Sequence, residues 1–393
     1  MIVAGEASGD RLAAELVGAL REAVGDREAI YGPDQQPLRA PLLPRFFGAG
    51  GPRMAAAGVE LAFDMTAHSV VGISGVIRDL MKFRRLFHIL LRLALERQPD
   101  LIICVDFSGF NRRLAAAIRK AVRSQAGIFK NWQPRIVQFV SPQVWASRES
   151  RVHQIARDYD LLLCIFPFEK EWYAQRVPQL PVEFVGHPMV GRFARVGCDD
   201  RKEAGARPKV VLLPGSRLGE IRRHIPLVTA AAKRIGERLP ATFCMVLPTK
   251  ELVRQFEAEV RAVPGITLQA GNVEHALRGA ALAITKSGTI TMECAFLGVP
   301  ALVFYKTSAL NYWIGKRIVK VKYLAMPNLL AKELVFPEFI QHAATPEAIS
   351  QAAIRLLENR EQQQQVRARL KDIVATLGAP GAVLRGAQAI LEL

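Results

Sequence analysis

"VVLLPGSRLGEIRRHIP", residues 210–226, predicts a buried strand, a small-residue loop and a helix that begins near Glu220. Gly215 lets the backbone approach a ligand, and the N–H groups of the loop and of the helix N-terminus favour an anion. Arg217 can donate two hydrogen bonds to phosphate oxygens. The alternative is a plain strand–loop–helix with a solvated basic helix. We favour an anion site, for which the candidates are Gly215, Ser216, Arg217 and Glu220.

The same alternation of strand and helix recurs along the chain. Apolar runs that predict buried strands lie at residues 100–107, 135–141, 160–168, 182–186, 209–216, 242–248, 281–288 and 300–306. Helical patterns lie between most of these runs. Continuous apolar strands with intervening helices predict α/β architecture, with parallel sheets that are covered on both faces.

A segment rich in glycine and charge, residues 186–209, precedes a fresh strand and predicts a domain boundary. We therefore expect two doubly wound, Rossmann-like domains that face a cleft. Residues 1–190 would form the N-terminal domain and residues 191–345 the C-terminal domain. The charged helices of residues 346–393 would pack back across the seam.

The net charge of the 393-residue chain is +17, which attracts anions such as nucleic acid, acidic lipids or phosphorylated substrates. The basic residues are spread out and few aromatic residues lie among them, so we do not expect nucleic acid to be the primary ligand. The five cysteines are widely separated and show no metal-ligand spacing, which predicts reduced core cysteines and no metal site. We find neither a signal peptide nor a run of apolar residues long enough to span a membrane, so we expect a cytoplasmic protein whose membrane association is peripheral.

A second polar loop follows a strand in "AITKSGTITMECAFLGVPALVFYK", residues 283–306. The loop consists of Ser287, Gly288 and Thr289, and Glu293 lies early in the helix that follows. In a two-domain α/β protein this loop would face the cleft, with the Glu293 carboxylate placed to accept hydrogen bonds from a ribose diol. The alternative is a helix cap with a solvent-exposed glutamate. Two polar loops of this kind in the same half favour the site.

Asp106 lies at the carboxyl end of a predicted strand in "CVDFSGFNRRLA", residues 104–115. An aspartate that faces a cleft at this position is a candidate general base. On this segment alone, a helix cap is the better interpretation.

The N-terminal stretch "MIVAGEASGDRLAAELVGAL", residues 1–20, also predicts a strand, a small-residue loop and a helix. Gly5 and Gly9 allow a tight turn but lack the spacing of a dinucleotide-binding loop. Ser8 or Asp10 can cap the helix that follows. An anion site at the helix N-terminus and a plain turn are both compatible with this pattern.

Residues 68–98 predict a helix from Gly75 onward with a broad apolar surface and many basic residues. A basic amphipathic helix fits an anionic membrane surface or an acyl-chain groove, and the alternative is a core helix. The portion that we expect to be exposed as a membrane patch contains Met81, Phe83, Arg84, Arg85 and Phe87.

Together, these segments resemble one family, the lipid-A-disaccharide synthases, which are inverting glycosyltransferases of the GT-B fold. The resemblance extends over nearly the whole chain. Three residues depart from the common pattern: Ser108, Ser147 and Gly191. The matching segments, in order, are AGEASGD (4–10), GGPRMAAAGVE (50–60), SPQVWASR (141–148), FVGHPMV (184–190), LLPGSR (212–217), TKSGTITMEC (285–294), YWIGKRIVKVKY (312–323) and MPNLLA (326–331).

The resemblance implies a reaction in lipid A (lipopolysaccharide) biosynthesis. UDP-2,3-diacylglucosamine would be the donor and 2,3-diacylglucosamine 1-phosphate the acceptor. The products would be a β-1′,6-linked disaccharide 1-phosphate and UDP. The resemblance implies no metal and no other cofactor, and a location on the inner face of the cytoplasmic membrane. A second copy of the chain is a candidate partner.

The resemblance also implies roles for individual residues. Asp106 would take the proton of the acceptor hydroxyl, in the acceptor-binding N-terminal domain. The C-terminal domain would bind the UDP-sugar, with Arg217 and the loop N–H groups at the diphosphate and Glu293 at the ribose. Asn328 would line the cleft near the sugar or diphosphate. The first loop would face the acceptor through Glu6, Ser8, Gly9 and Asp10.

Three alternatives remain open at this point. Another UDP-sugar enzyme of the same fold would be expected to carry different loops at residues 4–10 and 141–148. An inactive, membrane-associated UDP-sugar-binding protein would bind UDP without turnover. A nucleic-acid-binding protein would show steeply salt-dependent affinity for DNA or RNA.

Overall fold

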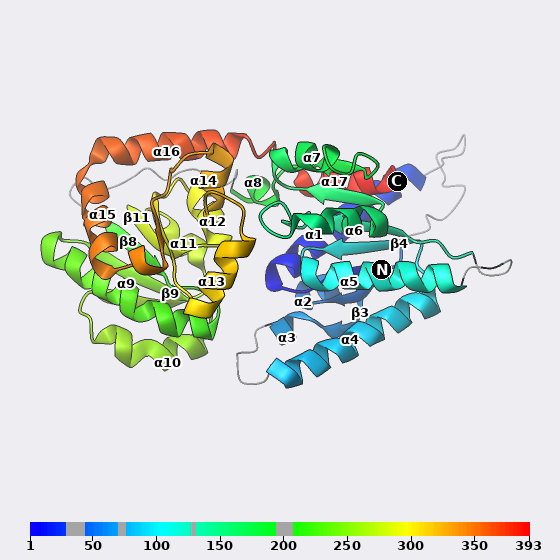
Figure 1. Ribbon diagram of the computed structural model, residues 1–393, viewed down its shortest axis with the longest axis horizontal. Helices are drawn as coiled ribbons and strands as arrows, with labels where there is room; N and C mark the ends of the chain where they lie inside the picture. Colours follow the sequence, from blue (N-terminus) through cyan, green and yellow to red (C-terminus); the bar gives the residue numbers. More distant parts are fainter. Residues whose placement is uncertain (29–43, 70–75, 126, 128–130, 194–206) are drawn as a thin grey trace, which may run out of the picture. The chain divides into compact units, whose positions relative to one another are not determined.

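The computed structural model describes residues 1–28, 44–69, 76–125, 127, 131–193 and 207–393. These residues form two compact units (Figure 1). The first unit comprises Met1–Gly191 and Leu377–Leu393, and the second comprises Arg192–Thr376. The C-terminal helices divide between them, because α15 (Pro346–Glu358) and α16 (Arg360–Ala375) belong to the second unit, whereas α17 (Ala382–Leu391) packs against α1 (Ala7–Glu28) in the first.

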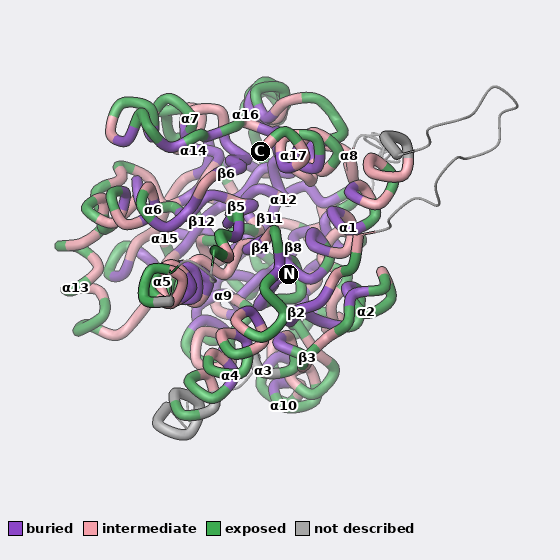
Figure 2. The backbone as a smooth tube through the Cα atoms, turned by 90° about the vertical axis from the view of Figure 1, so that its right-hand side faces the viewer, coloured by how far each residue is buried: buried purple, intermediate pink, exposed green. Residues whose placement is uncertain are grey.

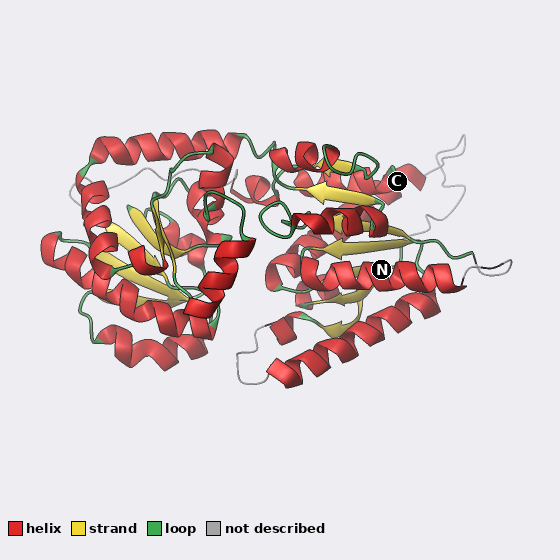
Figure 3. Ribbon diagram, in the orientation of Figure 1, coloured by secondary structure: helices red, strands yellow, loops and turns green. Residues whose placement is uncertain are grey.

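The first unit contains a seven-stranded parallel sheet in the order β3-β2-β1-β4-β5-β6-β7. Helices lie on both faces of this sheet, as Figure 3 shows. The strands are β1 (Ile2–Ala4), β2 (Phe47–Gly50), β3 (Glu60–Asp64), β4 (Leu101–Val105), β5 (Arg135–Phe139), β6 (Leu161–Cys164) and β7 (Val182–Phe184). The helices are α1 (Ala7–Glu28), α2 (Pro52–Ala56), α3 (Thr66–Ser69), α4 (Val76–Arg97), α5 (Ser108–Gln125), α6 (Val152–Asp158), α7 (Pro167–Ala174) and α17 (Ala382–Leu391). Helix α8 (Pro188–Phe193) spans the boundary at which the chain passes into the second unit.

The second unit repeats this design with six parallel strands in the order β10-β9-β8-β11-β12-β13. The strands are β8 (Lys209–Leu213), β9 (Thr242–Leu247), β10 (Ile266–Ala270), β11 (Leu282–Lys286), β12 (Ala301–Tyr305) and β13 (Glu338–Ile340). The helices are α9 (Leu218–Arg238), α10 (Lys250–Arg261), α11 (Val273–Leu277), α12 (Ile290–Phe296), α13 (Ala309–Ile318), α14 (Met326–Ala331), α15 (Pro346–Glu358) and α16 (Arg360–Ala375).

The strand that opens the second unit shows why both sheet faces are covered. Successive side chains of a strand point to opposite faces. In β8, Val210 and Leu212 enter one buried cluster, whereas Val211 and Leu213 enter another. A strand that is apolar on both faces must be covered by helices on both sides. Figure 2 shows central strands such as β4, β8 and β11 as buried.

The structure confirms the predicted α/β architecture and all eight predicted apolar strands. It adds four strands that the sequence pattern did not indicate: β2, β3, β10 and β13. Cys104, Cys164, Cys244 and Cys294 are free thiols, while Cys198 lies outside the described residues. No helix among the described residues is long and apolar enough to cross a membrane.

Each sheet has one point where the strand order reverses direction along the chain. This point lies between β1 and β4 in the first unit and between β8 and β11 in the second. Ligands of doubly wound proteins bind at the carboxyl ends of the strands at such a point. The loops that leave these four strands are therefore the candidate site of each unit.

Candidate active site

Asp106 directly follows β4 at the reversal point of the first sheet. Both Asp106 and Phe107 adopt left-handed backbone conformations, with φ of 49° and 45°. Such conformations are strained for residues other than glycine and persist only where the surroundings hold them. The Asp106 carbonyl oxygen accepts hydrogen bonds from Asn111 Nδ2 (2.8 Å) and Gln138 Nε2 (3.0 Å), and its N–H donates to Phe139 (2.8 Å). These hydrogen bonds hold the backbone of Asp106 and do not involve its carboxyl group.

The Asp106 carboxyl group is held in an environment that favours a bound proton. Burial raises its pKa most, and the negative charge of Glu6 raises it further, while a backbone hydrogen bond from Phe107 opposes them. A raised pKa makes an aspartate a stronger base once it is ionised. Glu6 is exposed in the loop that leaves β1. The structure therefore brings together two carboxyl groups that are 100 positions apart in the sequence.

The first turn of α1 lies directly beside Asp106. A Cβ atom added to Gly9 would lie 3.8 Å from the Asp106 Cβ and 3.6 Å from the Val105 carbonyl oxygen. The small-residue loop and the candidate base therefore form one surface, with Glu6 and Ser8 exposed on it. Their predicted role on the acceptor side stays a prediction.

Asp10 does not cap its own helix, contrary to one expectation from the sequence. Its carboxylate accepts hydrogen bonds from the backbone N–H groups of Gly51 (2.7 Å), Met54 (3.0 Å) and Arg53 (3.1 Å), at the N-terminus of α2. The side chain is 2% exposed. Both carboxylate oxygens accept these hydrogen bonds, so Asp10 connects α1 to the N-terminus of α2. Asp10 could contact an acceptor directly only if these hydrogen bonds were broken.

An aromatic cluster connects the base to α4. The Phe107 ring lies against Gly5, where an added Cβ atom would come within 2.2 Å of the ring. Phe107 stacks on Phe110 with ring centroids 5.5 Å apart, and α4 contributes Phe83 and Phe87 to the same group. The expectation that Phe83 and Phe87 are exposed is therefore wrong, because both are half-buried against the core.

The remaining residues of the predicted membrane patch do face solvent. Met81 is 63% exposed, and Arg84 and Arg85 are exposed beside it. Their association with a membrane stays a prediction. Gly75, from which the helix was expected to begin, lies outside the described residues.

The loop after β5 is held by a buried glutamate that the sequence analysis missed. Glu169 accepts hydrogen bonds from Ser141 Oγ (2.6 Å), Trp145 Nε1 (2.9 Å) and the Phe166 N–H (3.1 Å). Burial raises the pKa of Glu169 to about 6, against the lowering effect of these hydrogen bonds. Gln138 is a polar residue inside the apolar run of residues 135–141, and this signal could have identified it. Glu169 directly follows the apolar run of residues 160–168 and precedes Lys170, so its sequence context carries no such signal.

In the second unit, the loop after β8 carries Gly215 with a φ of 136°, a conformation that favours glycine. Helix α9 begins at Leu218, so the expected start near Glu220 is confirmed to within a turn. Arg217 is exposed at the N-cap position. The sequence predicts that the backbone N–H groups of this loop and of the first helical turn bind an anion, and that binding stays a prediction.

Glu220 connects the two polar loops of the second unit. Its carboxylate forms an ion pair with Lys286, at the end of β11, with 3.1 Å between Lys286 Nζ and Glu220 Oε1. Burial acts to raise the pKa of Glu220, but Lys286, a Ser216 backbone hydrogen bond and Arg217 outweigh it and lower the pKa. A carboxylate that stays ionised repels phosphate. The structure therefore supports Glu220 as a residue that positions the loops, and direct contact with the donor stays a prediction.

The loop after β11 presents Gly288 and Thr289 to solvent, while its first residue is anchored. Ser287 Oγ donates a hydrogen bond to the Leu324 carbonyl oxygen (3.1 Å). Glu293 is half-buried in the helix that follows, and its pKa is raised to about 7 by burial and by Glu274, against the effect of Arg192. A glutamate that gains or loses its proton near neutral pH suits a site where a ligand replaces water.

Asn328 does not reach the surface of this structure. It is 0% exposed, and its side chain bonds to the Phe336 backbone N–H (2.8 Å), the Phe336 carbonyl (2.7 Å) and Glu338 Oε1 (2.9 Å). Glu338 in turn accepts the N–H of Leu324, the residue whose carbonyl holds Ser287. Through Glu338 and Leu324, Asn328 therefore supports the loop after β11, and a direct contact with the sugar or diphosphate stays a prediction.

His224 connects the loop after β8 to the residue that directly follows β12. Its Nδ1 lies 2.6 Å from the Pro214 carbonyl oxygen and its Nε2 lies 2.9 Å from the Lys306 carbonyl oxygen. The ring is 1% exposed. His224 therefore helps to fix the geometry of the loop after β8.

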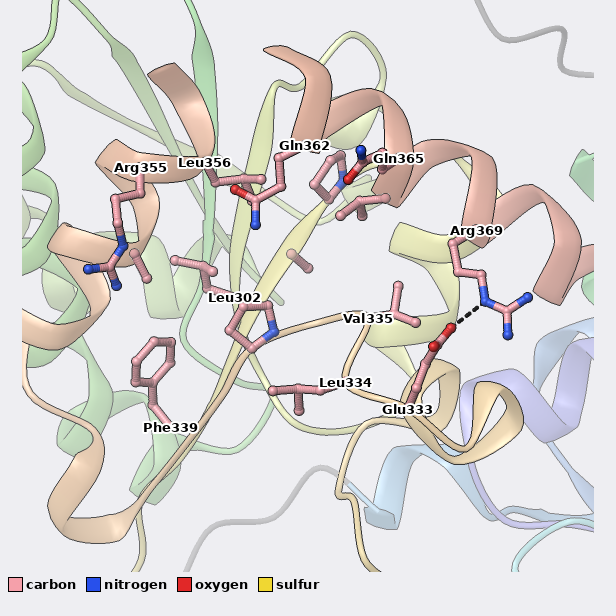
Figure 4. Close-up of a pocket in the computed structure, with 15 residues that line it drawn as sticks. Leu302, Glu333, Leu334, Val335, Phe339, Arg355, Leu356, Gln362, Gln365 and Arg369 are labelled. Carbon is pink, nitrogen blue, oxygen red and sulfur yellow. Dashed lines mark hydrogen bonds and ion pairs between the residues drawn. The ribbon is translucent and has the colours of Figure 1, made fainter. Parts of the chain in front are cut away.

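A cavity of about 530 Å³ in the second unit lies away from these loops (Figure 4). Its lining includes Pro300, Ala301 and Leu302 at the amino end of β12, together with Arg369, which pairs with Glu333. The two polar loops follow the carboxyl ends of β8 and β11, whereas the cavity lies at the amino end of β12. Because the strands are parallel, these are opposite ends of the sheet. This cavity is therefore separate from the candidate site.

Comparisons with known proteins bear on the whole chain. A family model described as lipid-A-disaccharide synthetase matches residues 1–391. The lipid-A-disaccharide synthase of Myxococcus xanthus is 35% identical over 405 residues, which cover 100% of this chain and 97% of that protein. The one from Alkalilimnicola ehrlichii is 36% identical over 396 residues, which cover 97% of this chain and 95% of that protein.

Solved structures of lower sequence similarity share the fold. The Staphylococcus aureus MnaA–UDP co-structure matches with a TM-score of 0.63 at 11% identity, covering 99% of this chain and 94% of that one. Acinetobacter baumannii MurG matches with a TM-score of 0.54 at 14% identity, covering 100% of this chain and 99% of that one. These similarities identify two Rossmann-like units of the GT-B type.

Proposed function

This chain belongs to the lipid-A-disaccharide synthetase family and is a glycosyltransferase that forms the lipid A disaccharide, and on that premise we propose how it does so. The donor is UDP-2,3-diacylglucosamine and the acceptor is 2,3-diacylglucosamine 1-phosphate. The products are the β-1′,6-linked disaccharide 1-phosphate and UDP. The observation that carries this proposal is Asp106, held in a strained backbone conformation at the reversal point of the first sheet.

In the proposed reaction the acceptor 6-hydroxyl oxygen attacks the anomeric carbon of the donor. The Asp106 carboxylate takes the hydroxyl proton, while the bond between the anomeric carbon and the diphosphate oxygen breaks and UDP leaves with the electron pair. Attack from the side opposite the leaving group inverts the anomeric centre. The partly buried Asp106, with its raised pKa, is suited to accept this proton.

The second unit stabilises the departing diphosphate. Negative charge grows on the diphosphate as the bond breaks, so fixed donors at that position lower the barrier. Arg217 and the N–H groups of the Gly215 and Gly288 loops supply these donors. The ion pair between Glu220 and Lys286 holds the two loops together before the substrate binds. Glu293, in its ionised form, accepts hydrogen bonds from the ribose diol.

The acyl chains of both substrates place this reaction at a membrane surface. On α4, the exposed apolar side chain of Met81 lies one turn before the exposed cations Arg84 and Arg85, which supports contact with the anionic inner face of the cytoplasmic membrane. The short aromatic path from α4 to Phe107 connects this surface to the base. A homodimer stays a prediction.

The test compares donors and acceptors with purified full-length protein. UDP release is followed with the diacylated donor and with UDP-N-acetylglucosamine, each with and without the acylated acceptor. The proposal expects release only when both acylated substrates are present. Turnover of the non-acylated donor at an equal or higher rate would instead indicate another UDP-sugar glycosyltransferase. UDP binding without any turnover would indicate an inactive binding protein.

A further inference from the structure

Helix α13 carries a row of large apolar side chains that face solvent. Leu310 is 66% exposed, Trp313 is 54% exposed and Ile314 is 41% exposed. Their spacing of three and four residues places them on one face of the helix. Val319, immediately after the helix, is 40% exposed. These four residues are half of the eight large hydrophobic residues that are exposed among the described residues.

The helix also lacks the packing that stabilises most short helices in proteins. No residue of α13 is buried. A ten-residue helix is marginal in water on its own, because most helical stability in proteins comes from burying an apolar face. This face therefore has apolar area to bury against something outside the unit.

The charge around the apolar row indicates the kind of partner. Between Ala309 and Tyr323 the sequence has no acidic residue. The four basic residues of this stretch are all exposed: Lys316, Arg317, Lys320 and Lys322. The Arg317 guanidinium carbon lies 3.5 Å from the centroid of the Trp313 ring, which keeps that cation beside the apolar row. The stretch thus combines an apolar face with positive charge alone.

We propose that α13 and residues 319–323 form a second membrane-contact surface, which docks the second unit on an anionic lipid bilayer. Tryptophan favours the membrane–water interface, and an amphipathic helix with a basic rim lies in that interface with its apolar face toward the acyl chains. A second copy of the chain is disfavoured, because pairing this surface with itself would bring like charges together. A single acyl chain is disfavoured, because side chains as exposed as Leu310 and Trp313 line no enclosed groove.

This surface lies next to the donor loops within its own unit. α13 follows the carboxyl end of β12, and Leu324, just beyond residues 319–323, binds Ser287 of the donor loop. Docking here would present the rim of the donor loop to the bilayer. The inference rests on the surface alone and does not depend on the reaction, so its test contains no substrate.

The test measures binding of the full-length protein to vesicles of phosphatidylglycerol and phosphatidylethanolamine by flotation. We expect the variant Leu310→Ser/Trp313→Ser/Ile314→Ser to bind at least tenfold more weakly than wild type. The matched controls are Leu334→Ser and Leu384→Ser, which remove leucines that are 58% and 45% exposed elsewhere. We expect these to bind within twofold of wild type. The charge variant Lys316→Glu/Lys322→Glu should also bind more weakly, and the deficit should shrink at high salt.

Fluorescence provides a second measurement that loss of folding would not mimic. Trp313 is the exposed tryptophan of the four in the chain, so brominated lipids should quench it. Trp313→Phe should keep vesicle binding but lose most of that quenching. Wild-type binding by the triple serine variant would overturn the proposal. If the triple serine variant binds vesicles unchanged but forms a smaller oligomer, the proposal is overturned in favour of a protein partner. If it binds vesicles unchanged but has a raised KM for the acylated donor in detergent, the proposal is overturned in favour of an acyl site.

Discussion

The side-chain amide of Gln138 lies 3.0 Å from the backbone carbonyl oxygen of Asp106 and donates a hydrogen bond to it. Gln138 is 0% exposed in the neighbouring strand β5. Through this bond, β5 fixes the backbone of the proposed base, which directly follows β4.

The first prediction concerns this bond. Gln138→Leu should lower kcat about tenfold and the free energy of unfolding by about 1–3 kcal/mol, because buried carbonyl groups lose their donor. Steady-state kinetics and urea unfolding test this; a raised KM for the donor with an unchanged kcat would contradict it.

Removal of the proposed base is the second prediction. Asp106→Ala should lower turnover about 10²- to 10⁴-fold, the range that general-base catalysis contributes. UDP affinity, measured by calorimetry, should stay within twofold, because we assign UDP to the second unit. Abolished UDP binding or intact turnover would show that the proposed role of Asp106 is wrong.

The carboxyl neighbour of Asp106 sets the third prediction. Burial raises the pKa of Asp106 most, and Glu6 adds to the increase. Glu6→Gln should therefore lower the pKa of Asp106, so that the base is ionised at lower pH. The acidic limb of the kcat/KM profile should move to lower pH by less than about one unit, because the exposed Glu6 charge is screened by solvent. A shift to higher pH would contradict this assignment.

Glu293 links pH to both stability and donor binding. Its pKa in the folded protein is raised to about 7, chiefly by burial, so folding favours the protonated form. This contribution to stability is complete below the unfolded pKa and is lost as pH rises through about 7. Glu293→Gln should therefore match wild type at about pH 4 and exceed its free energy of unfolding by up to about 3 kcal/mol at about pH 8.

The same substitution should change the pH dependence of UDP binding. If the ionised carboxylate accepts the ribose diol, wild-type affinity should fall about tenfold per pH unit below about pH 7. Glu293→Gln should bind UDP more weakly at about pH 8 and lose this dependence. Calorimetric titration at several pH values measures both effects, and a variant that keeps the wild-type pH profile would exclude Glu293 as its origin.

Arg217 carries the fifth prediction. A charge-assisted hydrogen bond contributes about 1.5–3 kcal/mol, so Arg217→Ala should weaken UDP binding roughly 10- to 150-fold. Arg223→Ala is the matched control, because Arg223 is also exposed but lies six residues further along the chain, within α9. We expect the control to change affinity less than threefold. Equal losses in both variants would indicate a general charge effect rather than a contact.

Much of the fold could be predicted because the strands of both sheets are apolar on both faces. The runs that contain β4, β8 and β11 are continuous and end in turn residues. β2 was missed because its sequence, FGAG, has two glycines, yet Gly48 is required there: an added Cβ atom would come within 1.9 Å of the Ile2 carbonyl oxygen. β13 was missed because Pro337 and Glu338 interrupt the apolar residues around this three-residue strand. Packing between strands, rather than local pattern, determines both.

The residues of the candidate site likewise include some that the sequence identified and some whose roles only the structure revealed. Sequence position identified Asp106, Arg217 and Glu293, because each follows the carboxyl end of an apolar strand. It could not reveal that Asp10 caps α2 or that Asn328 is buried, since their partners lie 41–44 and 8–10 positions away. Such contacts depend on tertiary structure. Motif residues of this kind position the site instead of lining it.

The most direct test of the account is the reaction itself. Purified wild-type protein is mixed with UDP-2,3-diacylglucosamine and 2,3-diacylglucosamine 1-phosphate, and both UDP and the lipid product are quantified. The account predicts one UDP released per disaccharide 1-phosphate formed, with a β-1′,6 linkage by mass spectrometry and NMR, and far slower formation by Asp106→Ala. Folded protein that binds UDP and yet forms no disaccharide from these two substrates would contradict it.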